Sequence, residues 1–225
     1  MAITQIPEKL ISVLEDIKPI LPSKAAPSHI IFDVGGVIIK YDNSDYYSNY
    51  LAKKTGLDAK EIQRRIESSL LPLFAVAQIS KAEFYKGVAK AVGISEKEVK
   101  WADYYANHAK INKQVISLIK RLKRKYKIAY FSNVDAAMYA RMREKLNPYA
   151  ALFDFKFASC KLHVAKPDPV AFRTVLEKMG VHASDTLFID DCAEYVRGAR
   201  AIGMKAILFK DNISLIKDLS KIKMI

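Results

Sequence analysis

Short apolar runs recur along the chain from His29 onward, and each has the length of a buried strand. The runs read HIIFD, KIAYFS, FDFKFAS, DTLFID and MKAILF. Helical periodicity fills the intervals between the later runs, at residues 135–147, 168–179 and 192–202. Strands that alternate with helices are typical of an α/β fold, in which a mostly parallel sheet is covered on both faces.

One long interval breaks this alternation. Between Lys40 and Lys110 we find no convincing strand, only helix-like stretches such as DAKEIQRRIESSL, KAEFYKGVAKAV and SEKEVKWADYYANHA. We therefore predict a helical cap domain at 41–110, inserted over the carboxyl edge of the sheet, where open α/β sheets bind ligands. The core would comprise residues 29–40 and 111–225.

An additional segment precedes the first strand. Apolar residues at positions 6, 10, 14 and 17 form one helical stripe, and a connector rich in proline and serine follows, LPSKAAPSH. We predict that residues 1–28 comprise an N-terminal helix and a linker.

The chain is strongly basic, with a net charge of +13. Six cations lie in KRLKRKYK at residues 120–127, and this run continues a helical pattern whose apolar residues are Val115, Leu118, Ile119 and Leu122. We interpret these cations as the solvent-facing side of a helix. Nucleic acid is therefore an unlikely partner, although binding through this helix stays an alternative that a salt-sensitive DNA or RNA shift would support.

The composition favours a cytoplasmic protein and argues against a disulfide framework or a cysteine metal site. Of the 225 residues, 51% are hydrophobic, which is enough to bury a core. There is no apolar run of 18 residues and no secretory signal pattern at the start, so we expect a cytoplasmic protein without a membrane partner. Cys160 and Cys192 are too few for a disulfide framework and lack metal-ligand spacing.

Polar residues follow four of the apolar runs or lie near the same edge of the predicted sheet. These are Asp33 in FDVGG, Ser132 and Asn133 in YFSNV, Lys166 in AKPDP, and Asp190 and Asp191 in FIDDC. Each alone could end a strand, begin a turn or cap a helix. Together, three carboxylates and a lysine under a cap would be electrostatically costly unless a cation and an anionic ligand neutralised them. Carboxylate oxygens suit magnesium, and phosphate is its usual co-ligand.

These residues resemble the haloacid dehalogenase-like superfamily. Its four motifs match FDVGGV, FSN, KPDP and FIDDCAEYVRGARAIGM, in order, over residues 29–211. The resemblance implies a Rossmann-like parallel sheet core with an inserted helical cap of the C1 type. It also implies a magnesium-dependent phosphatase in which Asp33 forms an aspartyl-phosphate.

The resemblance assigns a role to each motif residue. Asp33, Ser132 and Lys166 would be catalytic, and Gly36, Ser132, Asn133 and Lys166 would bind the phosphate. The Mg²⁺ ligands would be Asp33, the backbone carbonyl of Gly35, Asp190 and Asp191. Asp168 is not assigned a catalytic role, because an aspartate between two prolines is typical of a helix N-cap.

Gly35 departs from the common pattern, which has an aspartate two positions after the nucleophile to protonate the leaving group. Glycine keeps the metal-binding carbonyl but cannot transfer a proton, and such acid–base help is typically worth about 10²- to 10⁴-fold. We therefore expect an easily departing leaving group, as in an acyl phosphate or anomeric sugar phosphate, or a proton donor from the cap or the substrate. Nearby donors would be Tyr41, Asp42 and Asn43.

The sequence thus predicts a hydrolase of small phosphorylated metabolites. A 2-haloacid dehalogenase is one alternative, although that branch of the family needs no magnesium and has uncharged residues where Asp190 and Asp191 stand. A low-turnover phosphate-binding or regulatory protein is the other, and Gly35 is what favours it. The sequence gives no indication of oligomeric state.

Overall fold

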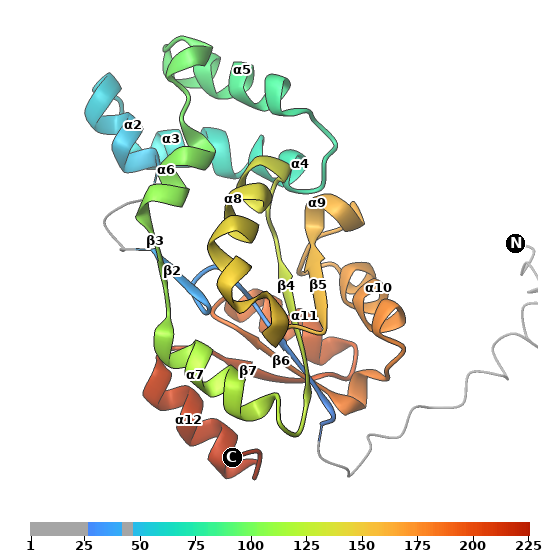
Figure 1. Ribbon diagram of the computed structural model, residues 1–225. Helices are drawn as coiled ribbons and strands as arrows, with labels where there is room; N and C mark the ends of the chain where they lie inside the picture. Colours follow the sequence, from blue (N-terminus) through green and yellow to red (C-terminus); the bar gives the residue numbers. More distant parts are fainter. Residues whose placement is uncertain (1–26, 42–46) are drawn as a thin grey trace, which may run out of the picture.

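A computed structural model describes residues 27–41 and 47–225, so the predicted N-terminal helix lies outside the described residues. The core is a five-stranded parallel sheet in the order β5-β4-β1-β6-β7 (Figure 1). Its strands are β1 (His29–Phe32), β4 (Lys127–Ser132), β5 (Phe155–Ala158), β6 (Thr186–Asp190) and β7 (Lys205–Leu208). The five apolar runs are therefore strands of one α/β sheet, as predicted.

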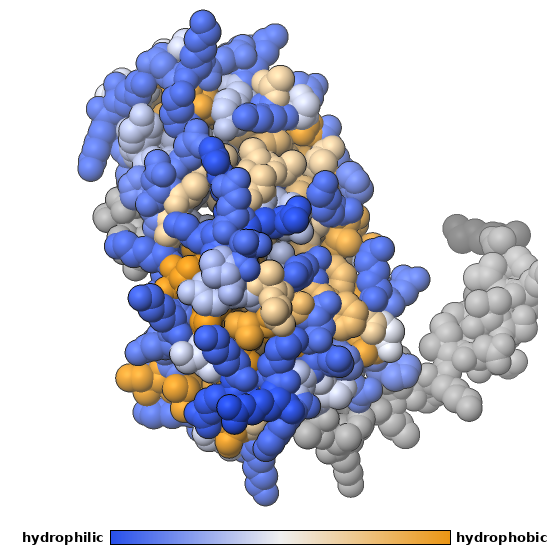
Figure 2. Space-filling model, in the orientation of Figure 1, coloured by the Kyte–Doolittle hydropathy of each residue, from blue (hydrophilic) through white to orange (hydrophobic). Residues whose placement is uncertain are grey.

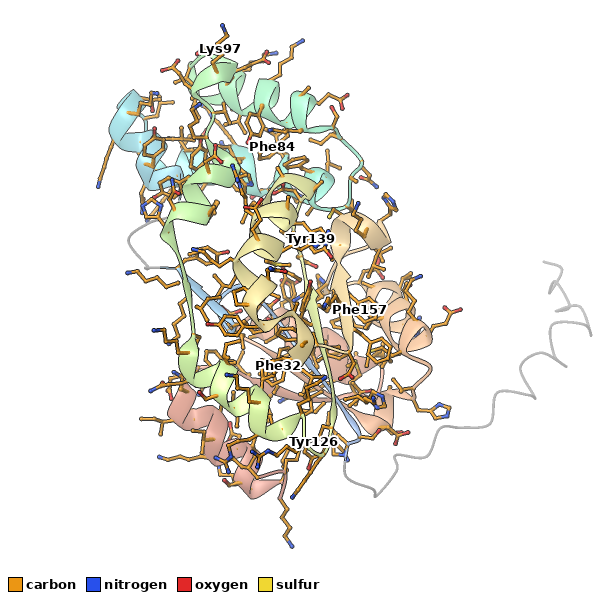
Figure 3. The ribbon with its side chains drawn as sticks, in the orientation of Figure 1. Phe32, Phe84, Lys97, Tyr126, Tyr139 and Phe157 are labelled. Atoms are coloured by element: carbon orange, nitrogen blue, oxygen red, sulfur yellow. The ribbon has the colours of Figure 1, made fainter. Side chains whose placement is uncertain are left out.

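Helices cover both faces of this sheet. Along β1, Ile30 and Phe32 pack in one cluster and Ile31 packs in another, because successive side chains of a strand point to opposite faces. Figure 3 labels Phe32 within the core. The first cluster includes residues of α7 (Lys113–Leu122), α8 (Ala136–Leu146) and α12 (Asn212–Lys221). The second includes residues of α10 (Pro169–Met179) and α11 (Ala193–Ala201).

The helix starts follow local sequence chemistry. Asp135 caps α8 by accepting hydrogen bonds from the N–H groups of Ala137 and Met138, at 2.8 and 3.0 Å. Asp168 caps α10 by accepting from Val170 at 2.8 Å, and Pro169 takes the first helical position. The prediction that Asp168 is a helix cap is confirmed.

A group of helices lies above the sheet, between β2 (Ile39–Tyr41) and β3 (Ala109–Ile111) (Figure 1). The group has its own hydrophobic core, in which Tyr47, Phe74, Phe84 and Trp101 are buried, and Figure 3 labels Phe84 there. The elements are α2 (Tyr47–Thr55), α3 (Ala59–Glu67), α4 (Leu71–Ala75), α5 (Lys81–Val92), η1 (Glu96–Glu98) and α6 (Trp101–His108). A separate core lets these helices pack as a unit, which we call the cap.

The stem of the cap is a strand pair that the sequence did not reveal. β2 and β3 pair antiparallel, with Ile39 opposite Ile111 and Tyr41 opposite Ala109. We expected no strand between Lys40 and Lys110, and this expectation is wrong at both ends of the interval. Strands of three residues are too short to show the period-two alternation that identifies a strand.

Short elements complete the described chain. The 3₁₀ helices η2 (Asn147–Leu152) and η3 (Ala183–Asp185) lead into β5 and β6, and α9 (Ser159–Leu162) follows β5. Within the described ranges, no helix has the length and apolarity needed to cross a membrane.

Hydrophilic side chains dominate the face seen in Figure 2. The basic run contributes to this surface, because α7 buries Val115, Leu118 and Leu122 while Lys120 and Arg121 are exposed. Further along the run, Lys123 and Lys127 pair with Asp154 at 3.1 and 3.5 Å. The cations thus face solvent as expected, but only Lys120 and Arg121 belong to the helix, because α7 ends at Leu122 and Lys127 begins β4.

Candidate active site

The carboxyl ends of three neighbouring strands bring the predicted polar residues together. Asp33 follows β1, Ser132 ends β4 and Asp190 ends β6, and β1 lies between the other two strands. Asp33, Ser132 and Asp190 are all buried. Parallel neighbours end at the same edge, so the sheet order alone is enough to converge these side chains.

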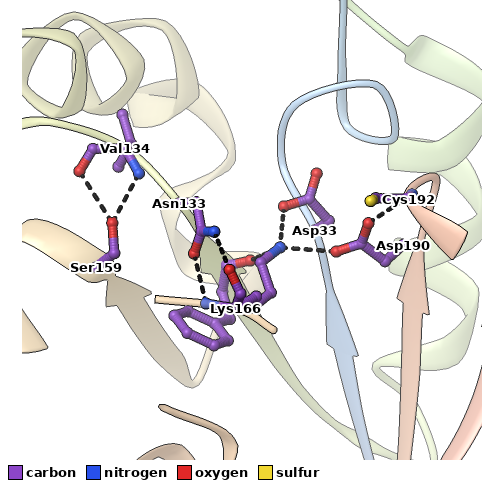
Figure 4. Close-up of polar contacts among 8 residues, drawn as sticks. Asp33, Asn133, Val134, Ser159, Lys166, Asp190 and Cys192 are labelled. Atoms are coloured by element: carbon purple, nitrogen blue, oxygen red, sulfur yellow. Dashed lines mark hydrogen bonds and ion pairs between the residues drawn. The ribbon is translucent and has the colours of Figure 1, made fainter. Parts of the chain in front are cut away.

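Lys166 is the centre of this cluster (Figure 4). Its Nζ donates to Asp33 Oδ1 at 2.6 Å, to Asp190 Oδ2 at 2.7 Å and to the carbonyl of Phe131 at 3.1 Å. The side chain is 0% exposed and lies over the rings of Phe131, Phe188 and Tyr195. All three donors of the ammonium are therefore used, and Lys166 holds the two carboxylates in place.

The buried charges shift one another's pKa. Burial raises the pKa of Asp33 to about 7, Asp190 and Asp191 add to the rise, and Lys166 opposes it. Burial disfavours the Lys166 cation, but Asp33 and Asp190 outweigh this effect and its pKa is raised. Asp191 is more exposed than these residues, and its partial desolvation, followed by the charge of Asp190, also raises its pKa. The cluster thus holds more acid than its one lysine can neutralise, and a further cation would favour the ionised carboxylates.

Three of the predicted metal ligands form a possible cation site. Asp33, Asp190 and Asp191 each present an oxygen, and these oxygens lie within 4.8 Å of one another. The donors are hard oxygens, which suits magnesium better than zinc. Asp190 Oδ1 also accepts from the N–H of Cys192 at 2.8 Å, which orients the carboxylate.

Gly36 makes room for Asp191. A Cβ on Gly36 would lie 1.9 Å from Asp191 Oδ2, and the glycine has a φ of +79°, which L side chains rarely adopt. Position 36 therefore lets a carboxylate approach the backbone, a steric role that the sequence-based prediction of a phosphate contact did not include.

Asn133 holds the backbone of Lys166. Its Nδ2 donates to the Lys166 carbonyl at 2.7 Å, and its Oδ1 accepts from the Lys166 N–H at 3.0 Å (Figure 4). Both ends of the amide are thus engaged within the protein. The sequence predicted a phosphate contact for this side chain, whereas the geometry makes it first a positioning residue for Lys166.

Two spaces border the cluster beneath the cap. A cavity of about 140 Å³ lies between α6 and α8, and its lining includes Gly35, Tyr41, Tyr105, Ser132 and Met138. A wider cleft of about 810 Å³ also reaches Asn133 and Lys166, and its lining includes residues of α4 and α11 and the segment 163–168. His163 also lines this cleft.

Buried polar bonds join the cap to the core, and sequence reasoning missed them. Ser159 Oγ donates to the carbonyl of Ala75 in α4 at 2.7 Å, and it accepts from the N–H of Val134 at 2.9 Å (Figure 4). Trp101 Nε1 of α6 donates to Asp135 Oδ2 at 3.0 Å. The position of Ser159 directly after β5 was the only signal available, and it did not indicate a partner.

Of the three nearby donors suggested in place of the missing acid, Tyr41 alone belongs to the described residues. Asp42 and Asn43 lie outside the described residues. Tyr41 lines the smaller cavity beside Gly35.

Comparison with known proteins finds similarity over most of the chain. The model of the haloacid dehalogenase-like hydrolase family matches residues 27–203. The chain is 30% identical over 189 residues to phosphatase MT3486 of Mycobacterium tuberculosis, covering 80% of this chain and 86% of that protein. A solved structure of a HAD family enzyme from Bacteroides thetaiotaomicron has a TM-score of 0.73 at 22% identity, covering 86% of this chain and 99% of that one. The same enzyme in complex with magnesium and inorganic phosphate has a TM-score of 0.67 at 23% identity, covering 82% and 95%.

Proposed function

Because the chain belongs to the haloacid dehalogenase-like hydrolase family, we propose that it is a magnesium-dependent phosphatase of small phosphorylated metabolites, with Asp33 as the nucleophile. The observation that carries this proposal is the position of Asp33 in the cluster. Its Oδ1 is held by Lys166 at 2.6 Å, and its Oδ2 faces the space beside Gly35, 3.9 Å from an ideal Cβ there. A carboxylate fixed by one oxygen can attack phosphorus with the other.

The surrounding residues would position the phosphoryl group. Ser132 lines the cavity at the end of β4, so its hydroxyl is available to a phosphate oxygen there. Lys166 would keep Asp33 ionised and aligned, and Asn133 would hold Lys166. Phosphoryl transfer is largely a matter of positioning and charge stabilisation, which suits such a set.

The donor set also suits the metal that the family uses. Asp33, Asp190, Asp191 and the carbonyl of Gly35 would hold magnesium, which offsets the charge of the phosphoryl oxygens when bound. The room that Gly36 leaves for the Asp191 carboxylate supports this assignment.

The size of the smaller cavity supports a small leaving group. At about 140 Å³, this cavity is far smaller than the cleft of about 810 Å³ that also borders the cluster. The acidic pair Asp190 and Asp191 supports a phosphatase over the dehalogenase alternative, because a halide-displacing site has no metal to hold.

The test is hydrolysis of p-nitrophenyl phosphate with and without magnesium, because nitrophenolate leaves without a proton. We expect magnesium-dependent release that Asp33→Asn abolishes. Asp185→Asn is the matched control, since Asp185 precedes β6 and lies at the opposite end of that strand from Asp190. This control should retain activity.

Two results would overturn the proposal. Halide release from a 2-haloacid without magnesium, lost in Asp33→Asn, would identify the dehalogenase. Magnesium and phosphate binding by the wild type with no turnover of any activated phosphate would identify the low-turnover binding protein.

A further inference from the structure

The space beside Gly35 is shared by Tyr41 and Asp33. An ideal Cβ on Gly35 would lie 3.8 Å from Tyr41 Cε2 and 3.9 Å from Asp33 Oδ2. Leaving out the glycine and its chain neighbours, no other heavy atom of the described residues comes within 4 Å of that point. A side chain at position 35 would therefore extend along the edge of the Tyr41 ring, and that ring now borders the space.

The backbone turn after Asp33 explains why Tyr41 returns to this place. Gly36 N–H donates to the carbonyl of Ile39 at 2.7 Å, and Ile39 N–H donates to the carbonyl of Val34 at 2.7 Å. The chain then enters β2, where Tyr41 pairs with Ala109 of β3. The stem of the cap therefore fixes the position of Tyr41 relative to the nucleophile.

Packing fixes the orientation of the ring as well. Tyr41 lies edge-to-face against Tyr105 of α6, with ring centroids 5.6 Å apart at 86°. Both rings line the cavity that also reaches Gly35 and Ser132. An aromatic pair in this geometry is well ordered, so the Tyr41 side chain is pre-positioned at the wall of the cavity.

The chemistry of a phenol suits this location. A phenol carries its proton near neutral pH without any special environment, so the Tyr41 hydroxyl has a proton to donate. A phenol is also a stronger acid than an aliphatic alcohol, so transfer to a departing alkoxide is favourable.

We propose that Tyr41 protonates the leaving oxygen in place of an acid at position 35, so that the enzyme accepts phosphate esters of alcohols as well as activated phosphates. This inference rests on the proposed phosphatase function. In the first step, Asp33 forms a bond to phosphorus, the bond from phosphorus to the leaving oxygen breaks, and that oxygen takes the Tyr41 proton. In the second, water attacks phosphorus, the bond to Asp33 breaks, and the Tyr41 phenolate takes a proton from the water.

The experiment compares wild type with Tyr41→Phe on a series of phosphate monoesters, from p-nitrophenyl phosphate through phenyl phosphate to an alkyl phosphate. We expect kcat/KM to fall only a few-fold for p-nitrophenyl phosphate and about 100-fold for the alkyl ester, the lower end of the range for acid–base catalysis. Tyr105→Phe is the matched control, because Tyr105 lines the same cavity but lies more than 4 Å from the ideal Cβ of Gly35. Its effect should not depend on the leaving group.

A double variant separates a chemical role from a structural one. Gly35→Asp in the Tyr41→Phe background adds a Cβ that makes only ordinary contacts, and the new carboxyl should restore hydrolysis of the alkyl ester by at least tenfold. A loss that is equal for all leaving groups, or a double variant without this recovery, would overturn the role of Tyr41. Hydrolysis of p-nitrophenyl phosphate by wild type would survive that outcome, so the proposed function and this inference fail separately. Wild type inactive on every ester would overturn both.

Discussion

Gly36→Ala should weaken magnesium binding, because the substitution displaces a proposed ligand without changing any charge. The new Cβ would lie 1.9 Å from Asp191 Oδ2, 2.5 Å from its Cγ and 3.0 Å from its Oδ1, whereas real Cβ contacts under 3.0 Å are essentially never seen. The carboxylate must therefore move by about 1 Å. Magnesium demands oxygen ligands at about 2.0–2.1 Å in near-ideal octahedral geometry, so such a shift removes Asp191 from the site.

The size of the effect follows from two separate contributions. Loss of an outer-shell partner typically costs a metal site about 10- to 100-fold in affinity, and we expect at least such a loss when a proposed ligand is displaced. Alanine at a φ of +79° adds a backbone cost of about 1–2 kcal/mol to folding. This second contribution acts with or without metal, and it should lower the melting temperature by about 2–4 °C per kcal/mol.

Calorimetric titration with magnesium and thermal melts of the metal-free protein separate the two contributions. Gly180→Ala is the matched control, since Gly180 has a φ of +67° and nothing within 4 Å of its ideal Cβ. Gly35→Ala is a second control, because its Cβ would make only ordinary contacts. Both should bind magnesium like wild type. Equal affinity in Gly36→Ala and Gly180→Ala would refute the reasoning, and so would the absence of magnesium binding in wild type.

Two further substitutions examine Lys166 and its support. Lys166→Met leaves the Asp33 and Asp190 carboxylates without the cation that now lies 2.6 and 2.7 Å away. The free energy of unfolding without metal should therefore fall by about 3–5 kcal/mol. Magnesium should raise the melting temperature of this variant more than that of wild type, and an equal rise in both proteins would contradict this. Asn133→Ala removes the hydrogen bonds of 2.7 and 3.0 Å to the Lys166 backbone. The free energy of unfolding, followed by thermal melts, should fall by about 1–3 kcal/mol, and kcat should fall with little change in magnesium affinity. An unchanged kcat would assign Asn133 a purely structural role.

The sequence predicted the convergence of the site because the convergence follows from sheet geometry. Asp33, Ser132 and Asp190 each stand at the carboxyl end of an apolar run, and parallel strands end at one edge. The same periodicity predicted the helices that cover the sheet. In contrast, the pairing of Asn133 with Lys166 joins residues 33 positions apart on two irregular segments, and no local pattern encodes it.

The steric difference between Gly35 and Gly36 could not be predicted from the sequence either. The exclusion of a side chain at Gly36 depends on Asp191, which is more than 150 residues away and comes near only through the pairing of β1 with β6. The GG pair indicates a turn, but it does not distinguish the open space beside Gly35 from the contact beside Gly36. The two glycines look alike in sequence and differ in the fold because their ideal Cβ atoms point to different neighbours.

The stem of the cap links the nucleophile to the substrate space. Asp33 and Tyr41 belong to one continuous segment that turns at Gly36 and enters β2, while β3 begins directly after α6. The surface ion pair of Asp103 with Arg141, at 2.8 Å, contributes little to holding α6 against α8, because both partners are about half exposed. The bond of Trp101 to Asp135 is buried and stabilises this contact more.

The same contact between α6 and α8 therefore forms part of the wall of the cavity that Tyr41 also lines. A leaving group that occupied this cavity beyond its present volume of about 140 Å³ would press on both helices and on the buried Trp101–Asp135 bond. It would also move Tyr105 away from the ring of Tyr41, against which it now packs edge-to-face. Under the proposed mechanism, size selection and proton donation are thus coupled, since a substrate that prevents docking of the cap also disturbs its own proton donor.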